Sequence, residues 1–342
     1  MNKYIHTDPW CLIEEGFHES DQLASETIFS LGNGEIGQRA NLEEYYSGET
    51  MLGSYVAGIY YPEEEERLNR EAATRQITDK IVNALNWTGI VVFLNDEKLD
   101  LATWEIQNFK RILNMREGYL ERTFDAISKK GHHIEVSVKR ILSMAETEIG
   151  AIHYSVKSLN FEGRISFMPI IDGDFYIPNL INDGPIWNVL QTMTQADVAH
   201  LWTQTRRTDY HVCAAMTYVL CKNNERMNII PAKIEKEKVA GFSVGTNVKK
   251  GDTLYINKYV AILNSLNHPR KELTELACSL AREAKQKGWS QLLEEHTAVW
   301  AEKWNYSDVS AEVDMETQQV SLYRQFRIMQ GLDGNDKISD KR

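Results

Sequence analysis

A glycine-rich stretch near the N-terminus is the first pattern in this sequence that could carry chemistry. Residues 32–37 read Gly-Asn-Gly-Glu-Ile-Gly, which fits the G-x-G-x-x-G pattern of a turn that binds a dinucleotide. Such a turn follows a strand and opens a long helix, whose free backbone N–H groups hold the pyrophosphate. The apolar run Ile28–Leu31 could be that strand, but Gly48 and Gly53 break the segment that follows. We therefore favour glycines in turns and bulges that join strands.

Two pairs of neighbouring carboxylates are the next candidates. Glycosidases cleave the sugar linkage with two carboxyl groups that lie across the scissile bond, about 5 to 10 Å apart. Asp172 and Asp174 stand two residues apart at the predicted end of a strand, and Glu43 is followed directly by Glu44. Because a chain with 49 acidic residues contains such pairs by chance, we favour roles in turns over roles in catalysis.

The spacing of histidine and cysteine residues predicts no metal site. His132 and His133 are adjacent, so on a strand they point to opposite faces, and His153 and His211 have no partner at ligand spacing. The cysteines form no C-x-x-C pair and are scattered over the chain, at Cys11, Cys213, Cys221 and Cys278. We predict buried, reduced thiols and neither a zinc site nor a disulfide framework.

Composition and charge exclude several classes of function. The chain has 342 residues, of which 42% are hydrophobic, so it can bury one large core or two smaller ones. Its net charge of −11 argues against nucleic acid and anionic membranes as partners. No window approaches 18 uninterrupted apolar residues, and residues 1–10 lack the apolar core of a secretion signal. We predict a soluble, cytoplasmic protein.

Strands are the elements that must position these residues. From Trp87 to Leu263, apolar and polar residues alternate in short runs that are bounded by turn residues. Many strands without helices between them predict a mainly β fold, a large antiparallel β-sandwich of the super-sandwich kind. The predicted strands are Ile90–Leu94, Tyr119–Phe124, His133–Leu142, Ala151–Val156, Arg164–Ile170, Tyr210–Leu220, Lys238–Val244 and Leu254–Leu263.

The pattern changes near residue 267. Trp300 and Trp304 share one apolar stripe, which either the sandwich or a helical partner outside this chain would cover. Gly288 is the predicted end of the first helix. Apolar residues recur at three and four positions in the three predicted helices, which are Pro269–Lys287, Ser290–Asn305 and Met315–Met329.

Two domains follow from this change of pattern. We predict a β-sandwich domain over residues 1–266 and a short helical linker over residues 267–342. The acidic run Glu63–Glu66 leads into a charged stretch, which predicts a solvated helix or loop.

The chain also resembles a known family over nearly its whole length. Residues 26–39 carry E-T-x-F-x-L-G-N-G-x-x-G-x-R, and residues 53–60 carry G-S-Y-V-A-G-I-Y. Further matches are F-K-R-x-L-x-M at residues 109–115 and H-x-x-x-W-x-x-x-W at residues 296–304. Together these motifs resemble the N-terminal domain and linker helices of glycoside hydrolase family 65, which contains maltose, kojibiose and trehalose phosphorylases.

This resemblance implies a function beside a catalytic barrel. Members of the family break α-glucosidic bonds in an (α/α)6 barrel, with one glutamic acid as general acid and, in the phosphorylases, inorganic phosphate as co-substrate. Because twelve helices do not fit into the residues after Asn267, we assign no catalytic residue, no metal and no cofactor, and expect the chain alone to be inactive. The expected function is to scaffold the barrel, with a homodimer contact as an additional role. The alternative is a free-standing carbohydrate-binding or interaction module.

Four aromatic residues are the candidates for contact with a disaccharide or another glucose-containing ligand. Sugar rings pack on the faces of Trp and Tyr side chains, as other amphipathic groups do. Tyr55, Tyr60 and Tyr61 lie in a stretch flanked by glycines, and Trp187 follows the turn residues 182–185. We predict these four residues on loops, and packing in the core is the alternative explanation for each of them.

Overall fold

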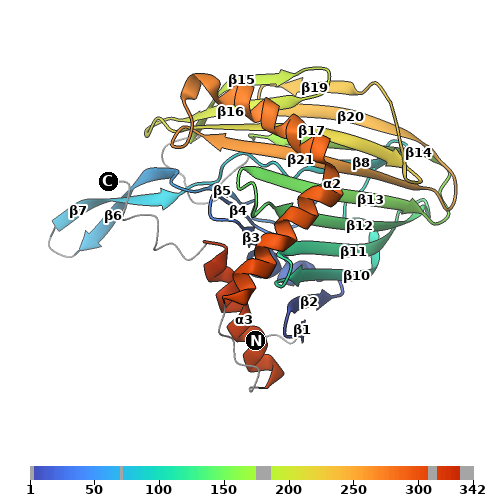
Figure 1. Ribbon diagram of the computed structural model, residues 1–342, viewed down its shortest axis with the longest axis horizontal. Coiled ribbons are helices and arrows are strands. Elements are labelled where there is room, and N and C mark those ends of the chain that lie inside the picture. The colour runs from blue at the N-terminus through green and yellow to red at the C-terminus, as the bar shows by residue number, and fades with distance from the viewer. Residues whose placement is uncertain (1–3, 70–71, 175–185, 307–313, 332–342) are drawn as a thin grey trace.

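The computed structural model describes residues 4–69, 72–174, 186–306 and 314–331. Strands dominate it, and they form two large sheets with two small sheets beside them (Figure 1). All strand pairs within these ranges are antiparallel, as the alternating pattern predicted. The predicted mainly β sandwich with a helical segment after it is therefore confirmed.

The larger sheet has eleven strands in the order β1-β2-β10-β11-β12-β13-β21-β17-β16-β15, with β18 paired to β17. Its strands are β1 (Ile5–Thr7), β2 (Cys11–Glu15), β10 (Glu105–Asn114), β11 (Tyr119–Ile127), β12 (His133–Leu142), β13 (Ile149–Ser158), β15 (Trp187–Thr194), β16 (Ala199–Thr205), β17 (His211–Lys222), β18 (Glu225–Arg226) and β21 (Thr253–Asn264).

The second sheet has five strands in the order β19-β20-β14-β8-β9. They are β19 (Ala232–Lys236), β20 (Val239–Val248), β14 (Gly163–Asp172), β8 (Ile90–Leu94) and β9 (Glu97–Lys98). The small sheets consist of β3 (Leu31–Gly32), β4 (Ile36–Gln38) and β5 (Ser54–Val56), and of the hairpin β6 (Tyr60–Asn69) and β7 (Ala72–Ile81). The helical elements are η1 (Glu19–Asp21), α1 (Gln22–Ile28), η2 (Arg270–Glu272), α2 (Leu273–Asn305) and α3 (Met315–Met329).

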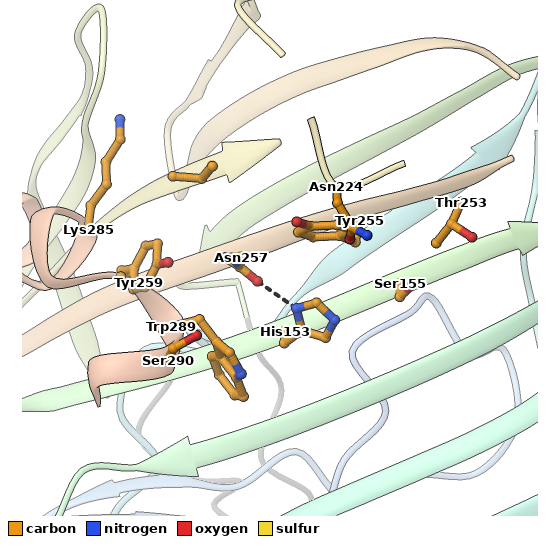
Figure 2. A pocket seen from close by; sticks show the side chains of 12 residues that line it. His153, Ser155, Asn224, Thr253, Tyr255, Asn257, Tyr259, Lys285, Trp289 and Ser290 are labelled. Atoms are coloured by element: carbon orange, nitrogen blue, oxygen red, sulfur yellow. Dashed lines mark hydrogen bonds between the residues drawn. The ribbon is translucent and has the colours of Figure 1, made fainter. Parts of the chain in front are cut away.

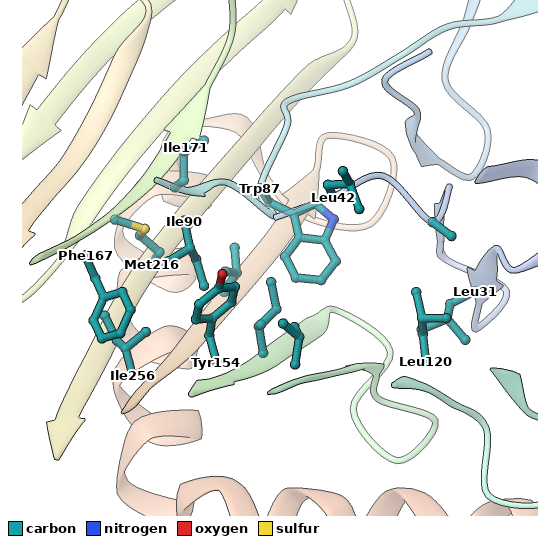
Figure 3. Close-up of a cluster of buried hydrophobic side chains, with 14 of the residues drawn as sticks. Leu31, Leu42, Trp87, Ile90, Leu120, Tyr154, Phe167, Ile171, Met216 and Ile256 are labelled. Carbon is teal, nitrogen blue, oxygen red and sulfur yellow. The ribbon is translucent and has the colours of Figure 1, made fainter. Parts of the chain in front are cut away.

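The core lies between the two large sheets. In β13, Ile152, Tyr154 and Val156 are fully buried, while the residues between them are partly exposed, because alternate side chains point to opposite faces. The ring of Tyr154 meets Phe167 of β14 edge to face at 5.8 Å. Figure 3 shows this part of the core, in which Trp87 lies beside the same cluster. Each large side chain buried here contributes roughly 1.5–3 kcal/mol to stability.

The opposite face of the larger sheet is covered by the first half of α2, which crosses the strands in Figure 1. Small residues meet there from both sides. Ala151 and Ala261 of the sheet and Ala277 and Ala281 of the helix are completely buried. Short side chains let the helix backbone lie close to the strands, so this half of α2 is part of the folded body rather than an appendage.

Gly288 divides α2 into the two helices that the sequence predicted. Its φ of 80° and ψ of 168° are not helical, and the helix continues on both sides of it. The second half is anchored by His296, which is buried: the backbone N–H of Met144 donates to Nδ1 at 3.1 Å, and Nε2 lies 3.1 Å from the carbonyl of Gly118. Burial lowers the pKa of His296 to about 4, so the ring is neutral and donates from Nε2.

The tryptophan stripe finds its cover within this chain. The indole of Trp300 is 1% exposed, and it stacks on Phe326 of α3 at 4.8 Å and on Trp304 at 6.2 Å. Helix α3 begins and ends where the sequence predicted, and the Asp314 side chain caps it by accepting from the N–H of Thr317. Trp300 therefore needs no helical partner from outside this chain.

Gly118 controls the contact between the second half of α2 and the sheet. Its φ is +73°, and a Cβ at this position would overlap the indole of Trp300. We expect Gly118→Ala to lower the free energy of unfolding by about 2 kcal/mol more than Gly131→Ala does. Gly131 is the matched control, because its φ is +80° and nothing lies within 4 Å of its Cβ position. Urea unfolding checks this, and equal losses in the two variants would show that the indole moves aside without cost.

The predicted strands all exist, and Ile90–Leu94 and His133–Leu142 have the predicted bounds. Six strands of the larger sheet were missed, namely β1, β2, β10, β15, β16 and β18. The prediction for Glu63–Glu66 was wrong, because this run lies in strand β6 and pairs with β7. Figure 1 shows the hairpin of β6 and β7 projecting away from the body of the molecule.

Candidate binding site

The G-x-G-x-x-G stretch is a hairpin turn between β3 and β4, as we favoured. Gly34 has a φ of +87°, and the amide of Asn33 holds the turn: its Oδ1 accepts from the N–H of Ile36 at 2.9 Å, and its Nδ2 donates to the carbonyl of Ser143 at 2.8 Å. Helix α1 precedes the stretch and no helix follows it before Gly48, so no helix N–H groups are available for a pyrophosphate. The dinucleotide alternative is therefore excluded.

Glu43 and Glu44 form a buried ionic cluster in the core, and the prediction of a turn role for them was wrong. Arg122 Nη2 lies 2.7 Å from a carboxylate oxygen of Glu43 and 2.6 Å from one of Glu44. Arg140 adds a second cation to Glu43 at 3.4 Å, and the phenol of Tyr154 donates to Glu44. Burial raises the pKa of Glu43, but the two arginines outweigh it and the net shift is downward. A carboxylate held ionised and away from solvent cannot act as a general acid.

The remaining sequence candidates for chemistry have structural roles. Asp172 accepts from the N–H of Asp174 at 2.7 Å, so it organises a turn, as predicted. Asp174 in turn lies 2.9 Å from the ammonium of Lys238. His132 and His133 pair with different acids, and no cluster of three metal-ligating side chains occurs among the described residues. The four cysteines are free thiols.

The four predicted aromatic residues do not form one site. Tyr61 is 2% exposed and belongs to the core, so the prediction of a loop position was wrong for it. Trp187 is the first residue of strand β15 rather than a loop residue, and its indole N–H donates to the carbonyl of Asn83 at 2.7 Å. Tyr55 lies in β5 and Tyr60 begins β6, so the prediction of a loop position was wrong for them too, and both are half-buried. Among the described ring contacts, none joins these four side chains to one another.

A depression of about 500 Å³ is the site that the sequence analysis missed. It lies on the outer face of the larger sheet, beside the point where Gly288 turns α2 (Figure 2). Strand register places its floor: His153 of β13 is opposite Asn257 of β21, Ser155 is opposite Tyr255, and Asn257 is also opposite Val219 of β17. Its other lining residues are Asn224, Thr253, Tyr259, Lys285, Gly288, Trp289 and Ser290.

Packing of α2 explains why the depression is open at this place. Along β13 and β21, the outward residues beneath the helix are the buried Ala151, Tyr259 and Ala261. Beyond them the outward residues become His153 and Asn257, which the helix no longer covers fully. Figure 2 shows Trp289, at the bend of the helix, beside His153. The rings of these two residues are 5.7 Å apart.

The lining of the depression is polar without being acidic. His153 Nδ1 lies 2.7 Å from Asn257 Oδ1, and because an amide oxygen only accepts, this nitrogen carries the proton. Burial lowers the pKa of His153, so the ring is neutral and Nε2 remains as an acceptor. Burial also raises the pKa of Tyr255 and of Tyr259 to about 12, so both phenols keep their protons. With no carboxylate in its lining, the depression can stack and hydrogen-bond a ligand but offers no carboxyl group as a general acid.

A signal for this site is present in the sequence. The outward positions of β21 read Thr253, Tyr255, Asn257 and Tyr259, whereas an exposed strand face ordinarily carries charged residues. From the sequence, His153 was considered as a metal ligand, for which it lacks a partner at the required spacing. Its actual neighbours are aromatic rings and an amide.

Comparison with known proteins places the chain in a family. The family model described as the N-terminal domain of glycosyl hydrolase family 65 matches residues 12–303. The chain belongs to this family. The resemblance found in the sequence is thereby confirmed. Maltose phosphorylase of Bacillus subtilis is 26% identical over 334 residues, a match that covers 98% of this chain and 44% of that protein.

Other family 65 proteins match to the same extent. The α,α-trehalose phosphorylase of Thermoanaerobacter brockii is 26% identical over 98% of this chain and 44% of its own length. The kojibiose phosphorylase of the same organism is 25% identical over 99% and 43%, respectively. The chain therefore spans less than half the length of these relatives. A solved structure, of a candidate kojibiose phosphorylase from the human microbiome, shares the fold with a TM-score of 0.84 at 23% identity, over 96% of this chain and 42% of that chain.

Two residues of the motif at residues 26–39 serve the fold in this chain. Glu26 is completely buried, and its carboxylate accepts from Thr50 Oγ1 at 2.5 Å and from the N–H of Met51 at 2.9 Å. Arg39 lies 3.8 Å from the same carboxylate and donates to the carbonyl of Leu23.

The helices of the described residues include none that is both long and apolar enough to cross a membrane.

Proposed function

We propose that this chain is the non-catalytic N-terminal portion of a disaccharide phosphorylase, or of a glycoside hydrolase, that acts on α-linked glucosides. Its function is to scaffold the catalytic barrel of that enzyme, for which inorganic phosphate is the co-substrate in the phosphorylase case. The observation that carries this proposal is the match of residues 12–303 to the N-terminal domain of family 65. The maltose, trehalose and kojibiose phosphorylases among its relatives support the class of substrate.

The state of the acidic residues supports the non-catalytic part of the proposal. A glycosidic general acid needs a carboxyl group that is protonated near neutral pH and faces the substrate. The ion pairs of Glu43 and Glu44 with Arg122 keep both groups away from a substrate. Burial raises the pKa of Asp172, but its carboxylate is engaged in a turn whose other acid is paired with a lysine.

We expect the purified chain to release no glucose 1-phosphate from maltose, trehalose or kojibiose in the presence of phosphate, and no glucose in its absence. The reason is that both reactions need a general acid, whereas the candidate carboxyl groups are held in ion pairs or in a turn, at Glu43, Glu44, Asp172 and Asp174. A coupled enzymatic assay for both products checks this, with maltose phosphorylase of Bacillus subtilis as the positive control. Product that forms in proportion to the chain, and that copurifies with it, would contradict the proposal.

The scaffolding part has its own test. The reading frame that follows the codon of Arg342 is to be sequenced, and a frame that encodes a helical barrel of family 65 supports the proposal. An immediate stop codon, with no such barrel encoded beside it, would contradict it.

A further inference from the structure

We propose that the depression beside Gly288 is a binding site for a neutral saccharide of linked pyranose rings. The site lies on the outer face of the larger sheet and contains none of the four aromatic residues that the sequence suggested. This inference goes beyond the scaffolding function and does not depend on it. A chain that supports no barrel would still bind at this site, and a scaffold without sugar affinity would still support a barrel.

A row of three flat rings is the first argument. The ring of His153 lies between Trp289 and Tyr255, with centroid distances of 5.7 Å and 5.1 Å. Trp289 and Tyr255 are half-buried, so each presents part of its ring to solvent. The steps between these rings are close to the spacing of neighbouring rings in a linked disaccharide. Aromatic surfaces combine a large apolar contact with a polar edge, which suits the apolar faces and hydroxyl rims of pyranoses.

Hydrogen-bonding groups around this row are the second argument. Asn257, in the floor, carries an amide that both donates and accepts, and His153 offers Nε2 as an acceptor. Ser155 and Thr253 add hydroxyl groups from the neighbouring strands. A sugar hydroxyl donates one hydrogen bond and accepts others, so it requires mixed partners of this kind. Recognition sites of this size combine apolar walls with a few placed polar groups.

Charge excludes other classes of ligand. A divalent cation needs carboxylate oxygens, and the lining has none. A phosphate group needs several cations, whereas Lys285 is the one cation in the lining. Burial, followed by the nearby charge of Arg226, lowers the pKa of this lysine. A neutral ligand of stacked rings and hydroxyl groups fits the lining best.

The strands and the helix hold the site in shape before a ligand arrives. Tyr259 is buried under the bend of α2, and it lines the depression together with Asn257 of the floor and Trp289 of the bend. The bend and the floor therefore meet at one buried ring. Such preorganisation reduces the entropy that binding would otherwise cost.

Calorimetry of the whole chain with maltose, trehalose and kojibiose tests the proposal. We expect a dissociation constant of about 1 mM or tighter for at least one of them. Tyr255→Ala and Trp289→Ala should each weaken this binding by about tenfold or more, because each removes one stacking surface. Tyr255→Phe keeps the ring and should bind within about twofold of the parent chain.

Matched controls separate the site from the rest of the surface. Tyr306→Ala removes a tyrosine that is 82% exposed at the end of α2, outside the depression, and should leave binding unchanged. Trp289→Phe should keep binding by calorimetry while the quenching of tryptophan fluorescence by sugar is lost. Because this readout uses a variant that keeps an aromatic ring, it holds even where Trp289→Ala impairs folding.

Two sources of the ligand share this chemistry, a free disaccharide and the end of a polysaccharide. Calorimetry tests the free disaccharides, and affinity electrophoresis in gels that contain soluble starch tests the polysaccharide end. If a chain end binds, starch retards the protein in the gel, and Tyr255→Ala should abolish this retardation. Binding of either source that is lost in Tyr255→Ala and kept in Tyr255→Phe supports the site. The absence of both heat and retardation at saccharide concentrations well above a millimolar overturns it, as does binding that is unchanged in both alanine variants.

Discussion

Replacement of Arg122 by methionine is expected to lower the free energy of unfolding by about 3–5 kcal/mol, because it leaves buried carboxylates without their cation. Arg122 is 4% exposed and contacts both Glu43 and Glu44, which are themselves 3% and 5% exposed. In the variant, Arg140 still faces Glu43, but Glu44 keeps only the phenol of Tyr154. Chemical unfolding of parent and variant measures the difference.

Lys139→Met is the control for this experiment. It breaks a charge pair with Glu121 whose side chains are 25% and 30% exposed, and solvent screening limits such pairs to at most about 1 kcal/mol. A triple variant that also carries Glu43→Gln and Glu44→Gln should recover part of the loss, because it removes the uncompensated charges. A loss below about 1 kcal/mol in Arg122→Met would contradict the view that this cluster stabilises the core.

The same cluster gives stability a dependence on pH with a defined sign. The pKa of Glu43 is lowered in the folded chain from its ordinary value of 4.5, because Arg140 and Arg122 outweigh the effect of burial. As the pH falls below that ordinary value, the unfolded chain binds this proton first. The contribution of Glu43 is therefore complete above pH 4.5 and is lost as the pH falls through the folded pKa. Arg122→Met should lose less stability over this range than the parent chain.

Replacement of Lys258 by methionine is expected to lower the free energy of unfolding by about 2–4 kcal/mol, since it strips hydrogen bonds from buried carbonyl groups. Lys258 is completely buried between the sheets, and its Nζ donates to the carbonyls of Trp87 at 2.5 Å, Ile170 at 2.7 Å and Gly89 at 3.0 Å. The side chain thus links β21 to β14 and to the segment before β8. Thermal and urea unfolding measure the loss.

Lys222→Met is the matched control for Lys258→Met. Lys222 also donates to a backbone carbonyl, that of Asn247 at 3.0 Å, and it pairs with Asp252, but its side chain is 26% exposed. Water replaces its partners, so we expect a change of at most about 1 kcal/mol. A gain in stability on Lys258→Met would show that the three carbonyls find other donors and would overturn this account of the residue.

Regular alternation explains why the sandwich was predictable from sequence. His133–Leu142 shows a clear period of two, and its buried residues Ile134, Val136 and Val138 face the core as predicted. The helix Met315–Met329 was equally predictable, since its apolar residues recur every three or four positions after an Asp cap. Strand β6 was not, because its run of four glutamates argues locally for a solvated segment, while pairing with β7 decides its conformation.

The candidate site could not be predicted, because its parts come from distant segments. The position of the bend in α2 decides which outward residues of β13 and β21 stay uncovered. This bend lies more than a hundred residues after His153 in the sequence. The buried charges escaped prediction for a similar reason. Arg140 and Lys258 sit at inward strand positions, and the groups that satisfy them, such as Glu43 and Trp87, lie far away in the sequence. Local pattern shows a charge but not its partner.

The bend of α2 makes one position far less free to mutate than its neighbours. Gly288 needs its positive φ, yet nothing lies within 4 Å of the place where a Cβ would be, so the constraint comes from its backbone alone. The helical segments on either side are each anchored by their own contacts, through Ala277 and Ala281 before the bend and through His296 and Trp300 after it. With φ 80° and ψ 168°, the backbone lies in a region that is essentially open to glycine alone, so over evolutionary time this residue should remain glycine while exposed Gln286, two residues away, drifts without constraint.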